Sequence, residues 1–537
     1  DENTCFDSPE NPLIMAGGPL CNEPRFPGTG KFIVGTISPL TNTFMDSNVG
    51  GDFSSILKAC GFDAIAVTGI ADEKCVVIID DDLEKISIVK APTVDEAVEN
   101  GGISYGENLL KEYTNNQLHK NIAAIATGIG AETTDFGLIN SFFYDSQRKR
   151  LRTKQAGRGG TGTVMRYKGL MGVIVHASQA RSKGNNPVDP AAVKAAGSAF
   201  GKVIKSEDPK QLNLAATGTP ALVEYMNNFH LLPINNFQRG QDEKSEQVFA
   251  NVFWEQFLKK KRADGCYFGC NLSCSKGAEE VTLQYGPRKG SIVGIDGPEY
   301  ETVGAVTGFG IFDAQYTMEY NWYCDEYGID TISTGVVMAF IMECWQRGYL
   351  TREEVGYDLN WGDMEAADRL FHETATAKGV GRIAANGVQQ AKLWIANNHA
   401  KKSGTPVEDV LGELEKFAME MKGLEFSMYI SRESLAQQGG YGLALKGPQH
   451  DEAWLIFLDQ VHREMETFEM KTAALKWFPL IRTWFSAVGL CKLPWIDVRH
   501  SEAEKTDNPA QNIPSFNLYI QFLNATTGSN KTIDDIL

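Results

Sequence analysis

The sequence predicts an α+β fold, in which an N-terminal antiparallel β-platform is followed by two mostly helical lobes. In the first third of the chain, short β-branched runs are separated at short intervals by Gly, Asp and Pro, which is typical of strands. The runs are KFIVGTI (31–37), DAIAVTGI (63–70), KCVVIID (74–80), ISIVK (86–90) and NIAAIATGIG (121–130). No long helical pattern alternates with them, so we expect a mainly antiparallel sheet rather than a doubly wound parallel one.

The rest of the chain has a helical periodicity. Apolar residues recur at i, i+3 and i+4 in three long segments, 334–350, 364–380 and 451–478. A polar stretch at 182–190 is typical of a linker. The predicted domains are a β-rich platform (1–181), a helical lobe with three clustered cysteines (190–375) and a second helical lobe (376–537).

Composition narrows the classes of function. The 537 residues carry a formal net charge of −17, and such an acidic surface repels phosphate backbones, so we expect no nucleic-acid partner. The chain has no run of about 18 uncharged apolar residues, so no membrane span is expected. It also lacks a signal-peptide pattern at its start. We therefore expect a cytoplasmic protein.

Three of the ten cysteines lie within nine residues, as Cys266-x3-Cys270-x3-Cys274. Such clustered thiols indicate metal ligation rather than a disulfide framework. The flexible residues of the loop GCYFGCNLSCSKG suit a [4Fe–4S] cluster, and Cys491 is the best candidate for a distant fourth ligand. Two alternatives stay open, which are buried structural cysteines and a zinc site, although structural zinc more often uses paired C-x2–4-C knuckles.

A glycine loop, AGRGGTG (156–162), contains the dinucleotide pattern G-x-G-x-x-G. A Rossmann turn also needs a preceding strand, a following helix and an acid about 20 residues later. Here a strongly basic stretch precedes the loop, we predict a turn running into a strand after it, and no acid follows through Arg181. NAD is therefore not expected. Lys154 and Arg158 beside the glycines suit an anion such as phosphate, and the alternative is a surface turn with solvated charges.

Several segments, taken in order, resemble the tungsten-containing aldehyde:ferredoxin oxidoreductases over nearly the whole chain. They are SPENPLIMAGGPL, ISPLTNTFMDSNVGG, GFDAIAVTG, QAGRGGTGTVM, HLLPINNFQRG, DGPEYETVGAV, CDEYGIDTISTG and VGLC. The resemblance implies a tungsten or molybdenum ion held by two pterins, a [4Fe–4S] cluster, and Mg²⁺ bridging the pterin phosphates. The family's first strands and a C-terminal stretch have no counterpart here, so we expect a sequence that is incomplete at both ends.

In this family each pterin is held by a D-x-x-G-L-[C/D] motif. The first motif matches as Asp325-Glu-Tyr-Gly328-Ile-Asp330, whose carboxylates would accept charge-assisted hydrogen bonds from pterin N–H groups. The second matches as Ser486-Ala-Val-Gly489-Leu490-Cys491, with Ser in place of Asp. That change alters one pterin contact, whereas Cys491 matches the fourth cluster ligand.

The resemblance also assigns residues of the platform. Lys31 and Lys154 match positions where the family tends to place Arg against pterin phosphates. Lysine keeps the positive charge, but it lacks the planar guanidinium group that can donate two parallel hydrogen bonds to a phosphate. Asn48 and Gln155 match positions whose backbone carbonyls face the bridging Mg²⁺, which prefers hard oxygen ligands.

Two further matches concern the reaction. Glu301 in GPEYET corresponds to the family's active-site Glu and would act as a base toward water. His450 in KGPQH corresponds to its active-site His and would donate a hydrogen bond to the carbonyl oxygen as negative charge develops. Without the resemblance, His450 would be a surface histidine and Glu301 an acid at a helix start.

Four features of the sequence bear on alternatives to a typical member of this family. The cysteine spacing begins C-x3-C instead of C-x2-C, and the residues beside His450 are more acidic than is usual. The family's E-x-x-H pair, which can bind iron between subunits, is Glu319-x-x-Trp322, so we expect no such iron site. Cys324, directly before Asp325, lies near where class II benzoyl-CoA reductases place a thiolate on tungsten.

The expected reaction is oxidation of an aldehyde to a carboxylic acid. Electrons would pass through the [4Fe–4S] cluster to ferredoxin or to an iron–sulfur partner subunit. The alternatives are an aromatic acyl-CoA (benzoyl-CoA type) reductase and a pterin-free iron–sulfur electron-transfer subunit. The sequence fits tungsten and molybdenum equally, does not specify the small aldehyde or acyl substrate, and is compatible with an oligomer.

Overall fold

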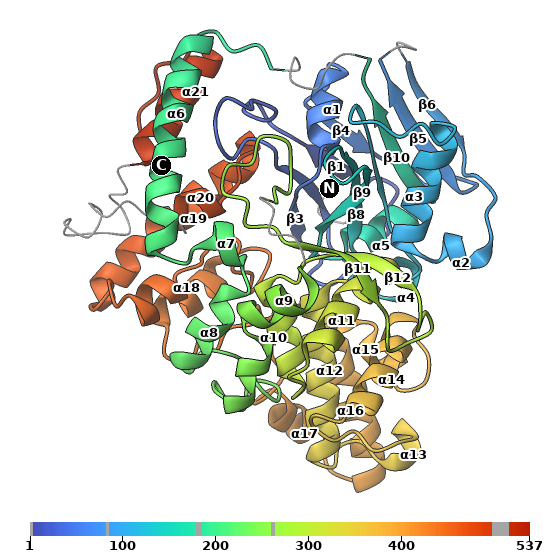
Figure 1. Cartoon of the computed structure of the whole chain (residues 1–537). Helices are drawn as coiled ribbons and strands as arrows, with labels where there is room; N and C mark the ends of the chain where they lie inside the picture. Colours follow the sequence, from blue (N-terminus) through green and yellow to red (C-terminus); the bar gives the residue numbers. More distant parts are fainter. Residues whose placement is uncertain (1–3, 82–84, 179–184, 259–263, 497–514, 537) are drawn as a thin grey trace.

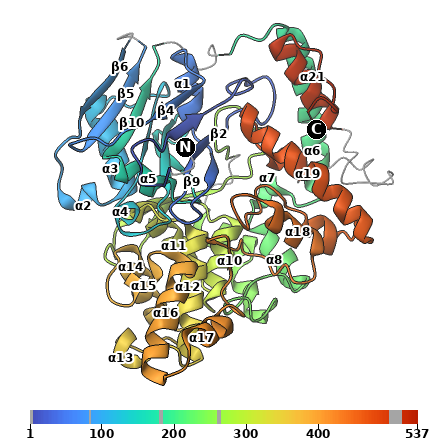
Figure 2. The same cartoon turned by 180° about the vertical axis from the view of Figure 1, so that it is seen from behind.

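The structure is a computed structural model that describes residues 4–81, 85–178, 185–258, 264–496 and 515–536. A β-rich N-terminal part lies against a larger helical part, and α6 (Pro190–Glu207) pairs with α21 (Phe516–Thr527) at one side (Figure 1). From behind, α19 (Phe468–Val488) is seen to run obliquely to this helix pair (Figure 2). The predicted α+β class is confirmed.

Two sheets form the platform. The first is antiparallel, in the order β3-β2-β1-β4. Its strands are β1 (Leu13–Ala16), β2 (Phe32–Ile37), β3 (Phe44–Val49) and β4 (Ala64–Val67). The second has the order β6-β5-β10-β7-β8-β9 and is antiparallel except for the β5–β10 pair. Its strands are β5 (Cys75–Asp80), β6 (Lys85–Lys90), β7 (Ile122–Ala126), β8 (Ile139–Asp145), β9 (Arg150–Ala156) and β10 (Leu170–His176).

All five predicted strand runs coincide with strands, because their alternating β-branched residues bury one face of a sheet. The platform also contains short helices between strands, which the strand pattern did not predict. These are α1 (Phe53–Ala59), α2 (Glu96–Glu99), α3 (Gly102–Tyr113), α4 (Gly130–Thr133) and α5 (Thr161–Tyr167).

The glycine loop 156–162 joins strand β9 to helix α5, so the expected turn running directly into a strand is wrong. Gly160 begins the helix in the left-handed region, with φ of +69°, and a Cβ there would lie 2.3 Å from the Asp135 carbonyl oxygen. Strands β9 and β10 run in opposite directions and are not neighbours. This strand–loop–helix is therefore not the parallel β-α-β unit that binds dinucleotides.

Residues 179–184, which include the predicted platform end and the start of the linker, lie outside the described residues. After the linker, Pro190 begins α6, and the side chain of Asp189 caps it by accepting the N–H groups of Ala191 and Ala192. The predicted helical character of this region is confirmed.

The remaining elements are mainly helices. They are α7 (Leu214–Thr217), α8 (Ala221–Asn228), α9 (Ala250–Phe257), α10 (Tyr300–Gly308), α11 (Ala314–Tyr327), α12 (Thr331–Gln346), α13 (Arg352–Val355), α14 (Met364–Ala375), α15 (Gly381–Ala384), α16 (Gly387–Ser403), α17 (Val407–Leu414), α18 (Leu435–Leu443) and α20 (Leu493–Ile496). Two hairpins accompany them, β11 (Gly277–Thr282) with β12 (Ile292–Asp296), and β13 (Glu420–Met421) with β14 (Leu424–Glu425).

The predicted helix over 451–478 is wrong in its first half. This stretch contains only a short π-helical turn (Phe457–Val461) before α19 begins at Phe468. The side chain of Gln437 holds the backbone there, since its amide oxygen accepts the N–H groups of Leu455 and Ile456 at 2.8 and 3.0 Å.

One hydrophobic cluster extends from Val193 to Ala525, so the two predicted helical lobes share a core. Their boundary at residue 375 stays a prediction. Platform residues such as Phe26 and Met45 also belong to this cluster, which fixes the platform against the helices. The cavity described below lies where the two parts meet.

Candidate active site

A cavity of about 380 Å³ lies between the platform and the helical part. Its walls come from strands β3 and β9, the cysteine loop, α10, α11 and the segments around residues 429, 450 and 491. Many of the predicted site residues share it. These are Lys31, Asn48, Lys154, Gln155, Cys266, Cys270, Cys274, Glu301, Asp325, His450 and Cys491.

The four predicted cluster cysteines converge on one side of this cavity. Cys266, Cys274 and Cys491 are 7%, 8% and 6% exposed, and Cys270 is half-buried beside them. Burial raises the pKa of the Cys491 thiol to about 12, and the neighbouring thiols of Cys266 and Cys270 add to this. Four thiols gathered at one side of a cavity suit a cationic metal cluster, which would hold them as thiolates.

Within the described residues, no group of three or more His, Cys, Asp or Glu is spaced to hold a single metal ion. The cysteines nevertheless surround common space. A cube of iron and sulfide needs that wider arrangement, because each thiolate binds a different corner. The donor set therefore fits a [4Fe–4S] cluster better than zinc.

Glycines of the platform make room for the cysteine loop. A Cβ at Gly30 would lie 2.0 Å from the ring of Tyr267, and one at Gly50 would lie 2.8 Å from the Cys266 carbonyl oxygen. The backbone N–H of Cys491 donates to the Gly28 carbonyl at 2.6 Å. These close approaches join two distant segments of the chain around the same cavity.

Lys31 brings a positive charge to the cysteines. Burial opposes that charge, but attraction to the thiols of Cys266, Cys491 and Cys274 outweighs it and raises the pKa of Lys31. A charged ammonium here would balance part of the negative charge of four thiolates. Its predicted contact with a pterin phosphate stays a prediction.

The two predicted pterin motifs are both ends of helices that point at the platform. Helix α11 ends at Gly328 with φ of +74°, and α19 ends at Gly489 with φ of +84°. A Cβ at Gly328 would lie 2.5 Å from the Gly128 nitrogen, and one at Gly489 would lie 1.8 Å from the Gly17 carbonyl oxygen. Glycine is needed at both places, because the backbone is left-handed and the platform is in contact.

Asp325 sits three residues before the first of these glycines and faces the cavity. It is 4% exposed, and burial together with repulsion from Asp296 raises the pKa of its carboxyl well above the usual range. Asn321 is a donor to it, at a long 3.3 Å. A buried carboxyl at the negative end of a helix is costly without N–H donors, so this position fits a pterin ring that supplies them.

Ser486 occupies the equivalent place in α19. Its hydroxyl accepts a hydrogen bond from Asn48 Nδ2 at 3.0 Å, which ties the helix to strand β3. The Oδ1 atom of Asn48 is buried and has no hydrogen-bond partner among the described residues, although the residue lines the cavity. Leu490 is fully buried below this helix end. Ser486, Gly489 and Leu490 are not on the cavity wall.

Asp330 and Arg158 have local partners. Asp330 caps α12 by accepting the N–H groups of Ile332 and Ser333, and it pairs with Arg158 Nε at 3.2 Å. Arg158 also donates to the Glu425 carbonyl at 2.6 Å. Neither residue is on the cavity wall, so this pair joins the platform to the helical part. Their predicted cofactor contacts stay predictions.

Lys154 lines the cavity but is already paired. Its ammonium group forms an ion pair with Asp296 and donates to Ser275 Oγ at 2.5 Å. Attraction to Asp296 outweighs burial and raises the pKa of Lys154. Gln155, the next residue along β9, donates weakly to Asn140 Oδ1 at 3.4 Å. A phosphate here would share Lys154 with Asp296.

Glu301 and His450 lie together on the cavity wall. Oε1 of Glu301 is 3.1 Å from Nδ1 of His450. Oε2 accepts the N–H of Met428 at 2.8 Å. Oε1 is buried and has no aligned hydrogen bond within the described residues, so it remains an acceptor beside the His450 ring.

Burial sets the protonation of this pair. It raises the pKa of Glu301 from 4.5 to about 7, and the Glu301 side chain is 12% exposed. It lowers the pKa of His450 to about 3, with further help from the charges of Arg482 and Arg158. The 29% of the His450 side chain that is exposed faces the cavity. At neutral pH the imidazole is therefore uncharged, while the carboxyl is near its midpoint.

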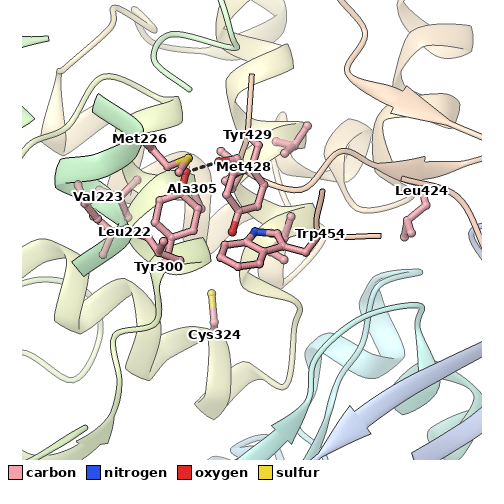
Figure 3. Packing of buried hydrophobic residues seen from close by; sticks show 14 of the residues in the cluster. Leu222, Val223, Met226, Tyr300, Ala305, Cys324, Leu424, Met428, Tyr429 and Trp454 are labelled. Atoms are coloured by element: carbon pink, nitrogen blue, oxygen red, sulfur yellow. Dashed lines mark hydrogen bonds between the residues drawn. The ribbon is translucent and has the colours of Figure 1, made fainter. Parts of the chain in front are cut away.

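Aromatic side chains that sequence reasoning missed form the wall beside the pair. Tyr300 stacks on Tyr429 at 4.9 Å, and its hydroxyl donates to the Met428 carbonyl at 2.5 Å. Figure 3 shows Trp454 next to these two rings. The hydroxyl of Ser427 lies 3.0 Å from His450 Nδ1. Tyr300 was within the GPEYET string, but the others come from segments without a local signal.

Cys324 lies away from this wall. It is fully buried in the hydrophobic core (Figure 3) and is not among the residues that line the cavity. Burial raises the pKa of its thiol well above the usual range. The geometry therefore gives no support to Cys324 as a metal ligand.

Comparisons with known proteins agree with these observations. Residues 2–177 match the family model "Aldehyde ferredoxin oxidoreductase, N-terminal domain", and residues 195–537 match "Aldehyde ferredoxin oxidoreductase, domains 2 & 3". A tungsten-containing aldehyde ferredoxin oxidoreductase of Pyrococcus horikoshii is 30% identical over 461 residues, covering 84% of this chain and 66% of the relative. The WOR-like subunit of an aliphatic sulfonate oxidoreductase of Pyrococcus furiosus is 30% identical over 458 residues, covering 82% and 66%.

The chain thus spans slightly less than two thirds of the length of these relatives. Among solved structures, the active-site complex BamBC of benzoyl coenzyme A reductase matches with a TM-score of 0.70 at 20% identity. That match covers 100% of this chain and 80% of the other, and it shows a shared fold. No helix of the described residues is long and apolar enough to cross a membrane.

Proposed function

The chain belongs to the aldehyde ferredoxin oxidoreductase family, and from this premise we propose that it oxidises an aldehyde to a carboxylic acid with a tungsten (or molybdenum) bis-pterin cofactor. The observation that carries the proposal is the Glu301–His450 pair, 3.1 Å apart on a cavity wall that the four cysteines share. Balanced, the reaction is RCHO + H2O → RCOOH + 2 H⁺ + 2 e⁻.

Glu301 would take the proton from the water that adds to the carbonyl carbon. A base works best when its pKa is near the working pH, and the buried carboxyl has a pKa of about 7. The Met428 N–H holds one carboxylate oxygen, and the other lies 3.1 Å from the His450 ring. Tyr300, Tyr429 and Trp454 limit the water around it.

His450 would orient the aldehyde. Its Nδ1 faces Glu301 and Ser427, at 3.1 and 3.0 Å. When Nδ1 accepts the hydroxyl proton of Ser427, the imidazole proton is on Nε2, which can donate to the carbonyl oxygen as negative charge develops. Because the pKa of His450 is about 3, this donor is the neutral ring.

The remaining cavity residues would hold the cofactors. When bound, the metal–pterin group supplies the two-electron acceptor that these side chains lack. Asp325 would accept pterin N–H groups, and Cys266, Cys270, Cys274 and Cys491 would hold the [4Fe–4S] cluster. Lys31 and Lys154 would face the pterin phosphates, with Mg²⁺ at the carbonyls of Asn48 and Gln155. Electrons would leave to ferredoxin or an iron–sulfur subunit, in the cytoplasm, where thiols stay reduced.

Metal analysis and a dye assay on anaerobically purified protein test this proposal. We expect tungsten or molybdenum with about four iron atoms per chain, and aldehyde-dependent reduction of a viologen dye. Reoxidation of reduced dye by benzoyl-CoA, without aldehyde activity, would assign the chain to the aromatic acyl-CoA reductases instead. Iron without tungsten, molybdenum or pterin would assign it to electron-transfer subunits.

A further inference from the structure

The cluster loop is open to the surface at one edge. Cys270 is the least buried of the four cysteines. Phe268, two residues before it, is 39% exposed, and Asn271, directly after it, is also exposed. The loop that carries Cys270 therefore reaches the outer surface at Phe268 and Asn271.

Helix α6 lies next to this edge. A Cβ on Gly201 would be 3.8 Å from the side-chain nitrogen of Asn271. Lys194 and Lys205 stand seven residues before and four residues after Gly201, and Lys202 follows it directly. At 3.6 residues per turn, these positions share one face of the helix. All three lysines are exposed.

The charge of these lysines is not compensated locally. Among the described residues, no carboxylate lies within 4.0 Å of their ammonium groups. The acid of α6 itself, Glu207, is 5% exposed and pairs with Lys210 at 3.0 Å. The chain as a whole has a net charge of −17, so an exposed stripe of lysines beside the cysteine loop is opposite in sign to the protein's overall charge.

We propose that the lysine stripe of α6 and the exposed edge of the cluster loop form the docking surface for a small acidic iron–sulfur protein. The inference rests on the proposed function, since it assumes a cluster that exports electrons. A basic patch would attract an acidic partner, whereas the acidic remainder of the surface would repel it. This complementarity sets orientation and association rate. Phe268, exposed on the same loop, supplies an apolar contact.

The test compares two triple variants of the whole protein with equal charge change. The first is Lys194→Glu, Lys202→Glu and Lys205→Glu. The control reverses three lysines that are also exposed and also lack a carboxylate within 4.0 Å among the described residues: Lys289→Glu, Lys378→Glu and Lys401→Glu. The probe is an acidic two-cluster bacterial-type [4Fe–4S] ferredoxin. Its reduction with aldehyde, reduction of methyl viologen, and calorimetric binding are all measured.

For the α6 variant we expect kcat/KM for ferredoxin at low salt to fall about tenfold or more, and the salt dependence to flatten. Viologen reduction should stay at the wild-type rate, and the control variant should keep its ferredoxin kinetics. Equal losses in both variants, or none, would overturn the proposal. So would a wild-type protein that reduces viologen but neither binds nor reduces the ferredoxin.

Failure of the proposed function gives a different result. In that case no aldehyde reduces viologen, yet binding of the ferredoxin to the two variants can still be compared by calorimetry. Dissociation of a wild-type dimer by the α6 substitutions, with unchanged ferredoxin binding, would identify the surface as a self-association interface and contradict the inference.

Discussion

Replacing Glu301 with Gln should slow aldehyde oxidation and, at alkaline pH, make the protein more stable. A carboxyl whose pKa is raised by folding binds its proton more tightly in the folded state. Its contribution to stability is complete below its ordinary pKa of 4.5 and is lost as the pH rises through about 7. The loss amounts to about 3 kcal/mol at pH 8 and about 1 kcal/mol at pH 5.

Glutamine removes the ionisation but keeps an oxygen for the Met428 N–H. Thermal unfolding at pH 8 should therefore occur about 3 °C higher in Glu301→Gln than in the wild type, and the gain should shrink at pH 5. Activity should move the other way, with kcat/KM reduced about 10²- to 10⁴-fold by loss of the base. In the wild type, kcat/KM should rise with pH to a plateau above about 7.

Glu425→Gln is the matched control. Burial raises the pKa of Glu425 to about 7 as well, but this residue is fully buried away from the cavity. Its substitution should alter stability without removing the acid limb of the pH profile. An active Glu301→Gln enzyme with normal metal content, or a wild-type profile that is flat between pH 5 and 8, would refute the assignment of Glu301 as the base.

Three further predictions concern the frame of the site. Cys491→Ala should lose most of the iron and the visible absorbance of the cluster, whereas Cys344→Ala, a buried cysteine of the core, should keep both. Gly489→Ala should fold poorly, because its Cβ would meet a platform carbonyl at 1.8 Å, while Gly404→Ala, with φ of +72° in open space, should cost only about 1 kcal/mol in urea unfolding. Arg158→Ala should lower the free energy of unfolding by about 3 kcal/mol, since it leaves a buried carboxylate unpaired; unchanged stability with loss of pterin would instead identify Arg158 as a phosphate ligand.

The parts of the fold that sequence predicted are those with local causes. Strand β5 (Cys75–Asp80) is a β-branched run whose own residues determine the strand, and α12 follows an Asp cap and a long apolar stretch. The cysteine loop was found because three ligands lie within nine residues. In each case the deciding interactions are formed within one short segment.

The elements and site residues that the sequence did not predict depend on contacts between distant segments or on very short helices. The helical pattern over 451–478 is interrupted because Gln437, from α18, takes up backbone N–H groups that a helix would otherwise use. Helix α5 is only seven residues long, too short for its periodicity to be distinguished from a turn before a strand. Ser427 and Tyr429 reach His450 from a loop more than 20 residues earlier in sequence, so no spacing rule could place them beside it.

The Ser486 departure from the pterin motif has a physical counterpart in Asn48, and this leads to a last prediction. The hydrogen bond to Ser486 orients the Asn48 amide, and its other end, buried and unpaired among the described residues, is on the cavity wall. A neutral amide oxygen would then accept the pterin N–H that a carboxylate accepts elsewhere in the family.

Asn48→Ala should weaken pterin retention about fivefold, the equivalent of one hydrogen bond of about 1 kcal/mol, and lower the pterin-to-metal ratio measured after oxidation. Gln155→Ala, an amide on the same wall, should keep the ratio, because only its backbone is expected near the cofactor. If Asn48→Ala retains full pterin while Ser486→Ala loses it, the serine hydroxyl itself is the contact and the role given to the amide is wrong.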